Sequence, residues 1–161
     1  MPSSEFFFSK IVPFIVIVVA GVALSVQVAV NSRLRFGVDS PILSAVISFA
    51  VGLLLLALLI SLGLFGGAGK GIEGMKTTPS WAFVGGMLGA FYVLMAIFVL
   101  PKLGTVITIA GTIFGQQVAA MLIDSNGWLG VTRTPLSLTR VVGSFLLLLG
   151  VILIQLPKEN H

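Results

Sequence analysis

Two adjacent glutamines, Gln116 and Gln117, lie in a stretch that is otherwise glycine, threonine and hydrocarbon, GTIFGQQVAAMLID over residues 111–124. A side-chain amide in apolar surroundings is costly unless it finds hydrogen-bond partners. On a helix, one face carries hydroxyls and the first of these amides: Thr105, Thr108, Thr112 and Gln116. Gln117 points about 100° away from that face and needs a different partner. Two interpretations fit: the side chains join helices by hydrogen bonds of about 0.6 kcal/mol each, or they line a solute pathway.

A second polar stripe lies near the N-terminus. It has the same spacing of three, four and four residues: Ala20, Ala23, Gln27 and Asn31. Two amides one helical turn apart are hard to leave in lipid, so we expect Gln27 and Asn31 to face a bundle interior or a cavity. Tyr92 also lies in mid-segment and needs a partner for its hydroxyl. Helix packing and a pathway role remain open for these three residues.

Pairs of glycines four residues apart occur in two segments. They are Gly85 with Gly89 and Gly111 with Gly115. The GxxxG spacing permits close approach of two helices in a membrane, although the motif alone has weak specificity. We therefore assign these four glycines to helix packing.

The ionisable residues give little support to an enzyme. Asp124 and Arg140 are close enough in sequence to form a structural or gating ion pair, and Arg140 has the alternative of snorkelling to the membrane surface. No carboxylate lies at the centre of an apolar segment, which favours a neutral, zwitterionic or amphiphilic solute over a hard cation. The single histidine is the terminal His161, and no metalloprotease, phosphate-loop or nucleophile-elbow motif occurs. We expect no catalytic residue, no metal and no cofactor.

These residues must be positioned by membrane-spanning helices. The chain has 161 residues, of which 57% are hydrophobic and 9% charged, and its mean hydropathy is +1.17. Soluble domains carry about 25% charged residues, and the nine scattered Lys and Arg give no basic run for nucleic acid. Five segments reach the roughly 20 apolar residues of a membrane span. The expected fold is an all-α, multi-pass bundle in one transmembrane domain, residues 1–161, with helices over 9–31, 41–65, 81–100, 103–123 and 137–156.

The distribution of positive charges does not determine the orientation of this bundle in the membrane. Five fall on the side of the N-terminus (Lys10, Lys70, Lys76, Arg133 and Arg140), and four on the other (Arg33, Arg35, Lys102 and Lys158). The positive-inside rule needs a clearer excess. Either one boundary residue is misplaced, or copies insert both ways and pair antiparallel.

Depth arguments favour an antiparallel pair. Gln116 lies about 4.5 Å from the centre of its segment and Gln27 about 8 Å from its own, on opposite sides of the midplane. In an antiparallel pair, the Gln116 of one copy and the Gln27 of the other lie on the same side, at depths that differ by about 4 Å if tilt is small. An odd number of helices also suits inverted repeats, the architecture of many secondary transporters.

Several stretches resemble the YdcZ-type family of inner-membrane exporters, a five-helix branch of the drug/metabolite transporter superfamily. They are GVALSVQVAVNSRLRFGVDSPILSAVISFAVG, PSWAFVGGMLGAFYVLMAIFVLPKLG, GQQVAAMLIDSNGWLG and TRVVGSFLLLLGVIL. The resemblance runs from about Gly21 to Leu153. It implies a location in the bacterial inner membrane, and a five-helix chain equivalent to one half of a ten-helix transporter.

The sequence thus predicts a secondary transporter or exporter of a small solute, working by alternating access. It acts as an antiparallel homodimer or with a homologous partner, in contact with membrane lipid. The first alternative is a non-transporting membrane subunit that stabilises a larger complex, and the second is a small channel. Dual insertion favours the transporter, and one fixed orientation with an unrelated partner favours the subunit.

Overall fold

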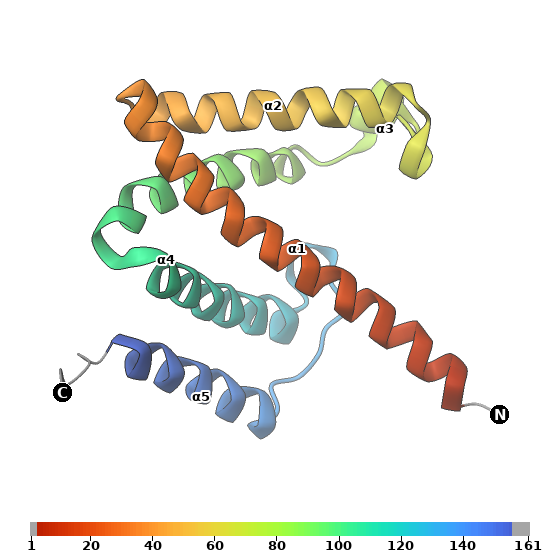
Figure 1. Cartoon of the computed structure of the whole chain (residues 1–161). Helices are drawn as coiled ribbons and strands as arrows, with labels where there is room; N and C mark the ends of the chain where they lie inside the picture. The colour runs from red at the N-terminus through yellow and green to blue at the C-terminus, as the bar shows by residue number, and fades with distance from the viewer. Residues whose placement is uncertain (1–2, 156–161) are drawn as a thin grey trace, which may run out of the picture. The chain divides into compact units, whose positions relative to one another are not determined.

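The computed structural model describes residues 3–155, and within that range the regular structure is helical (Figure 1). This confirms the all-α prediction. Three helical stretches are long and apolar enough to cross a membrane: Lys10–Val38, Pro41–Ser61 and Ser80–Asn126. The end of the last predicted helix at residue 156, with Lys158 and His161, lies outside the described residues.

Helix α1 (Ser3–Val38) and helix α2 (Pro41–Ser61) are joined by a very short turn. Helix α1 continues seven residues beyond the predicted end at residue 31, because no proline lies between that residue and the turn at Asp39, and Gly37 keeps a helical backbone. Ser40 is the N-cap of α2, and its side-chain oxygen accepts a hydrogen bond from the backbone N–H of Leu43 at 3.1 Å. Pro41 is in the first turn, and α2 begins there, at the predicted start.

Helix α2 ends at Ser61, four residues before the predicted limit. Gly63 adopts a left-handed conformation (φ 66°), which is the usual way for a helix to terminate at a glycine. A glycine-rich connection follows, with the 3-10 turn η1 (Leu64–Gly66) and the short helix α3 (Gly71–Thr77). Another 3-10 turn, η2 (Ser80–Phe83), then leads into α4.

Helix α4 (Val84–Asn126) contains both of the predicted helices 81–100 and 103–123. The 47 residues from Ser80 to Asn126 would extend about 70 Å as one straight helix, more than twice the hydrocarbon thickness of a bilayer. The backbone leaves the helical region at Gly104, where φ is 76° and ψ is 166°. This conformation is essentially restricted to glycine, so the break falls three residues after Pro101, where the sequence places the end of the third span.

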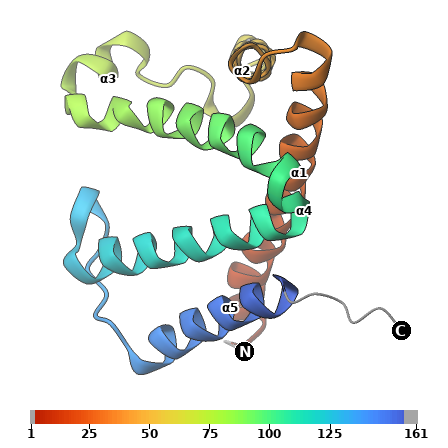
Figure 2. The same cartoon turned by 90° about the vertical axis from the view of Figure 1, so that its left-hand side faces the viewer.

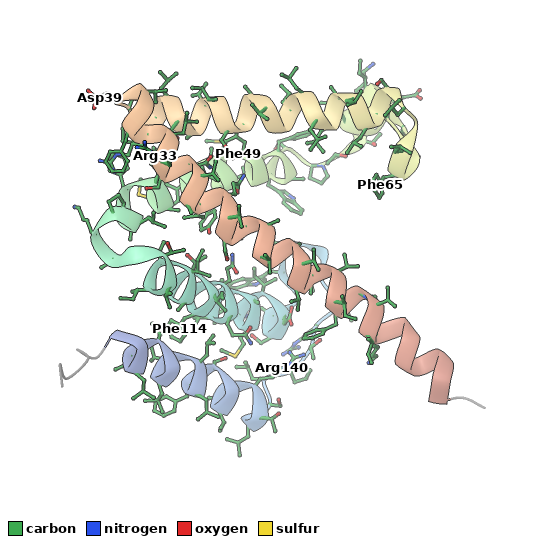
Figure 3. All side chains as sticks on the ribbon, viewed as in Figure 1. Arg33, Asp39, Phe49, Phe65, Phe114 and Arg140 are labelled. Atoms are coloured by element: carbon green, nitrogen blue, oxygen red, sulfur yellow. The ribbon has the colours of Figure 1, made fainter. Side chains whose placement is uncertain are left out.

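The chain divides at Pro101 into two compact units. In the first unit, Ala45 of α2 packs with Val93 and Ile97 of α4, and Tyr92 lies against this small core. Figure 3 shows the labelled Phe49 on α2, whose ring lies 3.9 Å from the position of a Cβ at Gly89. Most other apolar side chains of this unit are exposed, as expected for helices that lipid surrounds.

The second unit contains the part of α4 after Pro101, the 3-10 turn η3 (Trp128–Gly130) and α5 (Leu138–Gln155). Helix α5 runs back alongside this part of α4, as both views show (Figure 2). The hydroxyl of Ser144, buried in α5, lies 3.4 Å from the sulfur of Met121 and 3.0 Å from the carbonyl oxygen of Arg140. At 18 residues, or about 27 Å, α5 is close to the thickness of the hydrocarbon layer.

Candidate functional site

Helices α1 and α2 are joined by a buried hydrogen bond near their common turn. Ser44 is completely buried, and its hydroxyl donates to the backbone carbonyl oxygen of Asn31 at 2.7 Å. Asn31 itself is only 4% exposed. Because a serine is small, the two helices approach closely here, and the first polar stripe is held against α2.

An open groove lies along this pair of helices, with a volume of about 540 Å³. Gln27 and Asn31 line it from α1, and Ser48 lines it from α2. The remaining lining residues are apolar, and none is charged: Ala23, Val26, Val30, Leu34, Ile47, Val51 and Gly52. We call it the α1–α2 groove. Its size falls within the range of small-molecule sites, and its amides and hydroxyl can hydrogen-bond a solute without attracting either sign of charge.

A second groove, between α2 and the first part of α4, differs in chemistry. Its volume is about 390 Å³, and it is lined by Ala, Val, Leu, Ile and Phe side chains such as Phe49 and Phe91. No polar side chain lines it. It could accommodate an acyl chain or an apolar side chain, but it provides nothing with which to orient a polar solute.

Two buried polar atoms of the first unit have no hydrogen-bond partner within residues 3–155. They are the amide nitrogen of Asn31 and the hydroxyl oxygen of Tyr92. Tyr92 is half-buried beside the core formed by Ala45, Val93 and Ile97. Since buried polar groups are normally paired, these two side-chain atoms are the least satisfied in this unit. Both residues are among those for which the sequence leaves a pathway role open.

The polar stripe of α4 changes in exposure along its length. Thr108 is buried and Thr112 half-buried, and each hydroxyl donates to a carbonyl oxygen of its own helix, that of Gly104 at 2.7 Å and that of Thr108 at 2.8 Å. Gln116 and Gln117 are both exposed. The threonine hydroxyls therefore find acceptors within their own helix, whereas the side chains of Gln116 and Gln117 are exposed in the single chain.

Asp124 and Arg140 lie 3.4 Å apart between Oδ2 and Nη1, across the connection between α4 and α5. Arg140, labelled in Figure 3, is in the first turn of α5. The side chains are 39% exposed for Arg140 and 35% for Asp124, so water screens their attraction. Two further hydrogen bonds close this connection: Arg133 Nε donates to the Ser125 carbonyl at 2.9 Å, and the Thr134 N–H to the Asp124 carbonyl at 2.8 Å.

The glycines assigned to helix packing differ from one another. A Cβ at Gly89 would meet Phe49 of α2, whereas a Cβ at Gly85, Gly111 or Gly115 would meet nothing within 4 Å. Inside one chain, then, only Gly89 of these four lies close to a neighbouring helix. The other three present open helix faces.

Ser44 and Ser48 are the residues whose role the sequence does not reveal. Together with Gly52 they follow a small-residue spacing that predicts packing alone, yet Ser44 bonds to α1 and Ser48 lines the α1–α2 groove. The sequence does contain one indication of these roles. Both serines lie near the start of a helix that follows the helix with Gln27 and Asn31 after a very short connection.

Comparison with known protein families shows which family the chain resembles. The family model described as "Putative inner membrane exporter, YdcZ" matches residues 12–153. No curated protein and no solved structure matches the chain.

Proposed function

Because this chain belongs to the YdcZ family of inner-membrane exporters, we propose that it is a secondary transporter that exports a small neutral or amphiphilic solute. It is a multi-pass protein of the inner membrane. Its family consists of exporters, a class that is usually not enzymatic. The solute, the dimer and the alternating-access cycle are the proposed parts of this function.

The α1–α2 groove is the observation that carries the proposal for the solute. Two amides and a hydroxyl line it, and no charged side chain does. A bare cation or anion entering the groove would lose hydration without gaining a counter-charge, which is costly. A solute with hydrogen-bonding groups and no net charge would exchange its water contacts for Gln27, Asn31 and Ser48.

The open face of α4 supports an antiparallel pair. Gln116 and Gln117 are exposed, and Gly111 and Gly115 have no neighbour within the chain. Exposed amides in a bilayer are unfavourable, and small residues allow close helix approach. A second, inverted copy would cover these residues and bring its Gln116 toward the groove that contains Gln27. Rocking of the two copies would then open the shared cavity to each side in turn.

A chemical screen tests the transport function. Cells that lack or overproduce the protein are compared for tolerance to a panel of small compounds and for metabolites released into the medium. Overproduction is expected to raise tolerance to, or release of, at least one neutral or amphiphilic compound. Gln27→Leu should abolish the effect, whereas Ser25→Ala should not, because Ser25 bonds to the Gly21 carbonyl of its own helix. If only charged compounds respond, or none, the proposal for the solute is wrong.

Crosslinking tests the antiparallel pair. The chain has no cysteine, so Gln27→Cys and Gln116→Cys can be placed in two differently tagged copies without background. Efficient crosslinking between the copies, with reporters at both termini showing insertion in both directions, would support the homodimer. One fixed orientation together with a required unrelated protein would instead support the non-transporting subunit.

A further inference from the structure

Helix α4 loses one of its own hydrogen bonds at Pro101. In an α-helix, the backbone N–H of a residue donates to the carbonyl four residues earlier. Pro101 has no N–H, so the carbonyl of Ile97 is left without its usual donor. Ile97 is completely buried, and an unpaired carbonyl in such a position is costly.

Arg35 of α1 supplies the missing donor. Its Nη1 donates to the Ile97 carbonyl oxygen at 3.1 Å. The guanidinium carbon also lies 5.4 Å from the centre of the Phe98 ring and 5.6 Å from that of Phe36. Arginine suits this position because its planar group can hydrogen-bond at its edge while its face contacts aromatic rings.

The charge of Arg35 also suits the end of a helix. Carbonyl groups near a helix C-terminus carry partial negative charge, which a nearby cation stabilises. The helical run before Gly104 ends at Leu103, two residues after Pro101. Arg35 lies in the last turn of α1, so one side chain connects the end of α1 with the end of the first half of α4.

We propose that Arg35 is a positioning residue that replaces the hydrogen-bond donor absent at Pro101 and makes the end of α1 and the first half of α4 move as one body. The second part rests on the proposed transport function. Arg35 follows Gln27 and Asn31 at intervals of four residues on α1, so the groove-lining stripe leads directly to this connection. A solute bound in the α1–α2 groove would thereby act on α4 through α1.

A double-mutant cycle between Arg35 and Pro101 tests the first part. Arg35→Met removes the donor and the charge while keeping an apolar side chain, and should lower the melting temperature of the purified protein by about 3–6 °C. Pro101→Ala restores the backbone N–H at position 101, which can again donate to the Ile97 carbonyl. In that background Arg35→Met should cost much less, because the carbonyl keeps a helical donor. If Arg35→Met lowers the melting temperature equally with Pro101 and with Ala at position 101, the proposal is overturned.

Two further variants control for charge and folding. Arg33→Met removes a neighbouring, exposed positive charge from the same end of α1 and should leave the melting temperature nearly unchanged. If Arg33→Met lowers it as much as Arg35→Met, the effect is one of charge and not of the hydrogen bond. Should Arg35→Met fail to fold, Arg35→Lys gives the same cycle in milder form, since lysine keeps the charge but loses the planar group.

Transport and hydrogen exchange test the second part. For a compound identified by the screen, Arg35→Met should slow export, and addition of Pro101→Ala should restore part of it. Amide exchange over residues 98–105 should rise in Arg35→Met and return toward the original rate in the double variant. Loss of export without this rescue would reject the shared movement. Failure to find any exported compound would reject the transport function, while leaving the melting and exchange results able to decide the role of Arg35.

Discussion

Replacement of Ser44 measures how tightly α1 and α2 are joined. Ser44→Ala removes the hydroxyl that donates to the Asn31 carbonyl at 2.7 Å. That carbonyl lies inside α1 and keeps its helical donor, so no buried acceptor is left unpaired. The expected loss in free energy of unfolding is the net value of one hydrogen bond in a membrane protein, about 0.6 kcal/mol and at most about 1.7 kcal/mol.

A larger side chain at the same position should cost more. Ser44 has no exposed surface, so Ser44→Leu must force the two helices apart or distort its own rotamer. Overpacking of this kind costs about 1–3 kcal/mol, in addition to the lost hydrogen bond. The order of destabilisation should be Ser44→Leu, then Ser44→Ala, then Ser48→Ala, because Ser48 is only half-buried and lines the groove.

The measurement is equilibrium unfolding of the purified protein in bicelles, followed by helical content for the original chain and the three variants. Groove binding by a transported compound provides a second readout, since Ser44→Leu should widen or close the α1–α2 groove. The reasoning is refuted if Ser44→Leu is as stable as Ser44→Ala. That result would mean that the helices are not in close contact at this point.

Three other predictions concern single features of the fold. Gly104→Ala should lower the free energy of unfolding by about 1–3 kcal/mol because φ 76°, ψ 166° excludes other residues. By contrast, Gly143→Ala, inside helix α5 with open space around it, should stabilise the chain by up to about 1 kcal/mol; equal effects in unfolding experiments would contradict the break at Gly104. A double-mutant cycle with Asp124→Asn and Arg140→Met should give a coupling energy below about 1 kcal/mol, since both side chains are more than one-third exposed, and a value above about 2 kcal/mol would contradict that exposure. Gly115→Ile should weaken self-association, measured by energy transfer between labelled copies in vesicles, without lowering the stability of the single chain; unchanged association would place the contact elsewhere.

Much of the fold follows from length and local chemistry. Apolar segments of about 20 residues must be helical in a bilayer, because only internal hydrogen bonds satisfy the backbone there. The start of α2 was equally predictable, since Ser40 and Pro41 act within one turn of the chain. The ends of the helices were less predictable. Gly63 ends α2 earlier than expected, and the break in α4 falls at Gly104 and not at Pro101, which stays inside the helix.

Burial of individual polar side chains could not be read from periodicity. Gln27 and Asn31 share one stripe, yet Gln27 is exposed and Asn31 is buried. The difference arises because Asn31 lies where Ser44 bonds to α1, and that contact depends on how two helices meet. In the same way, Pro101 predicts that the Ile97 carbonyl lacks its helical donor, but nothing in the sequence identifies Arg35 as the side chain that donates to it.

The length of α1 has a consequence for its N-terminal end. From Lys10 to Arg33 the helix rises about 35 Å, which is slightly more than the hydrocarbon layer and places these two cations near opposite headgroup regions. Ser3 lies seven residues before Lys10, so the helical backbone continues about 10 Å beyond that lysine, toward the N-terminus. A protease site or epitope added before this extension would be separated from the membrane-spanning segment by about two helical turns, and digestion of sealed vesicles would show directly what fraction of the copies points each way.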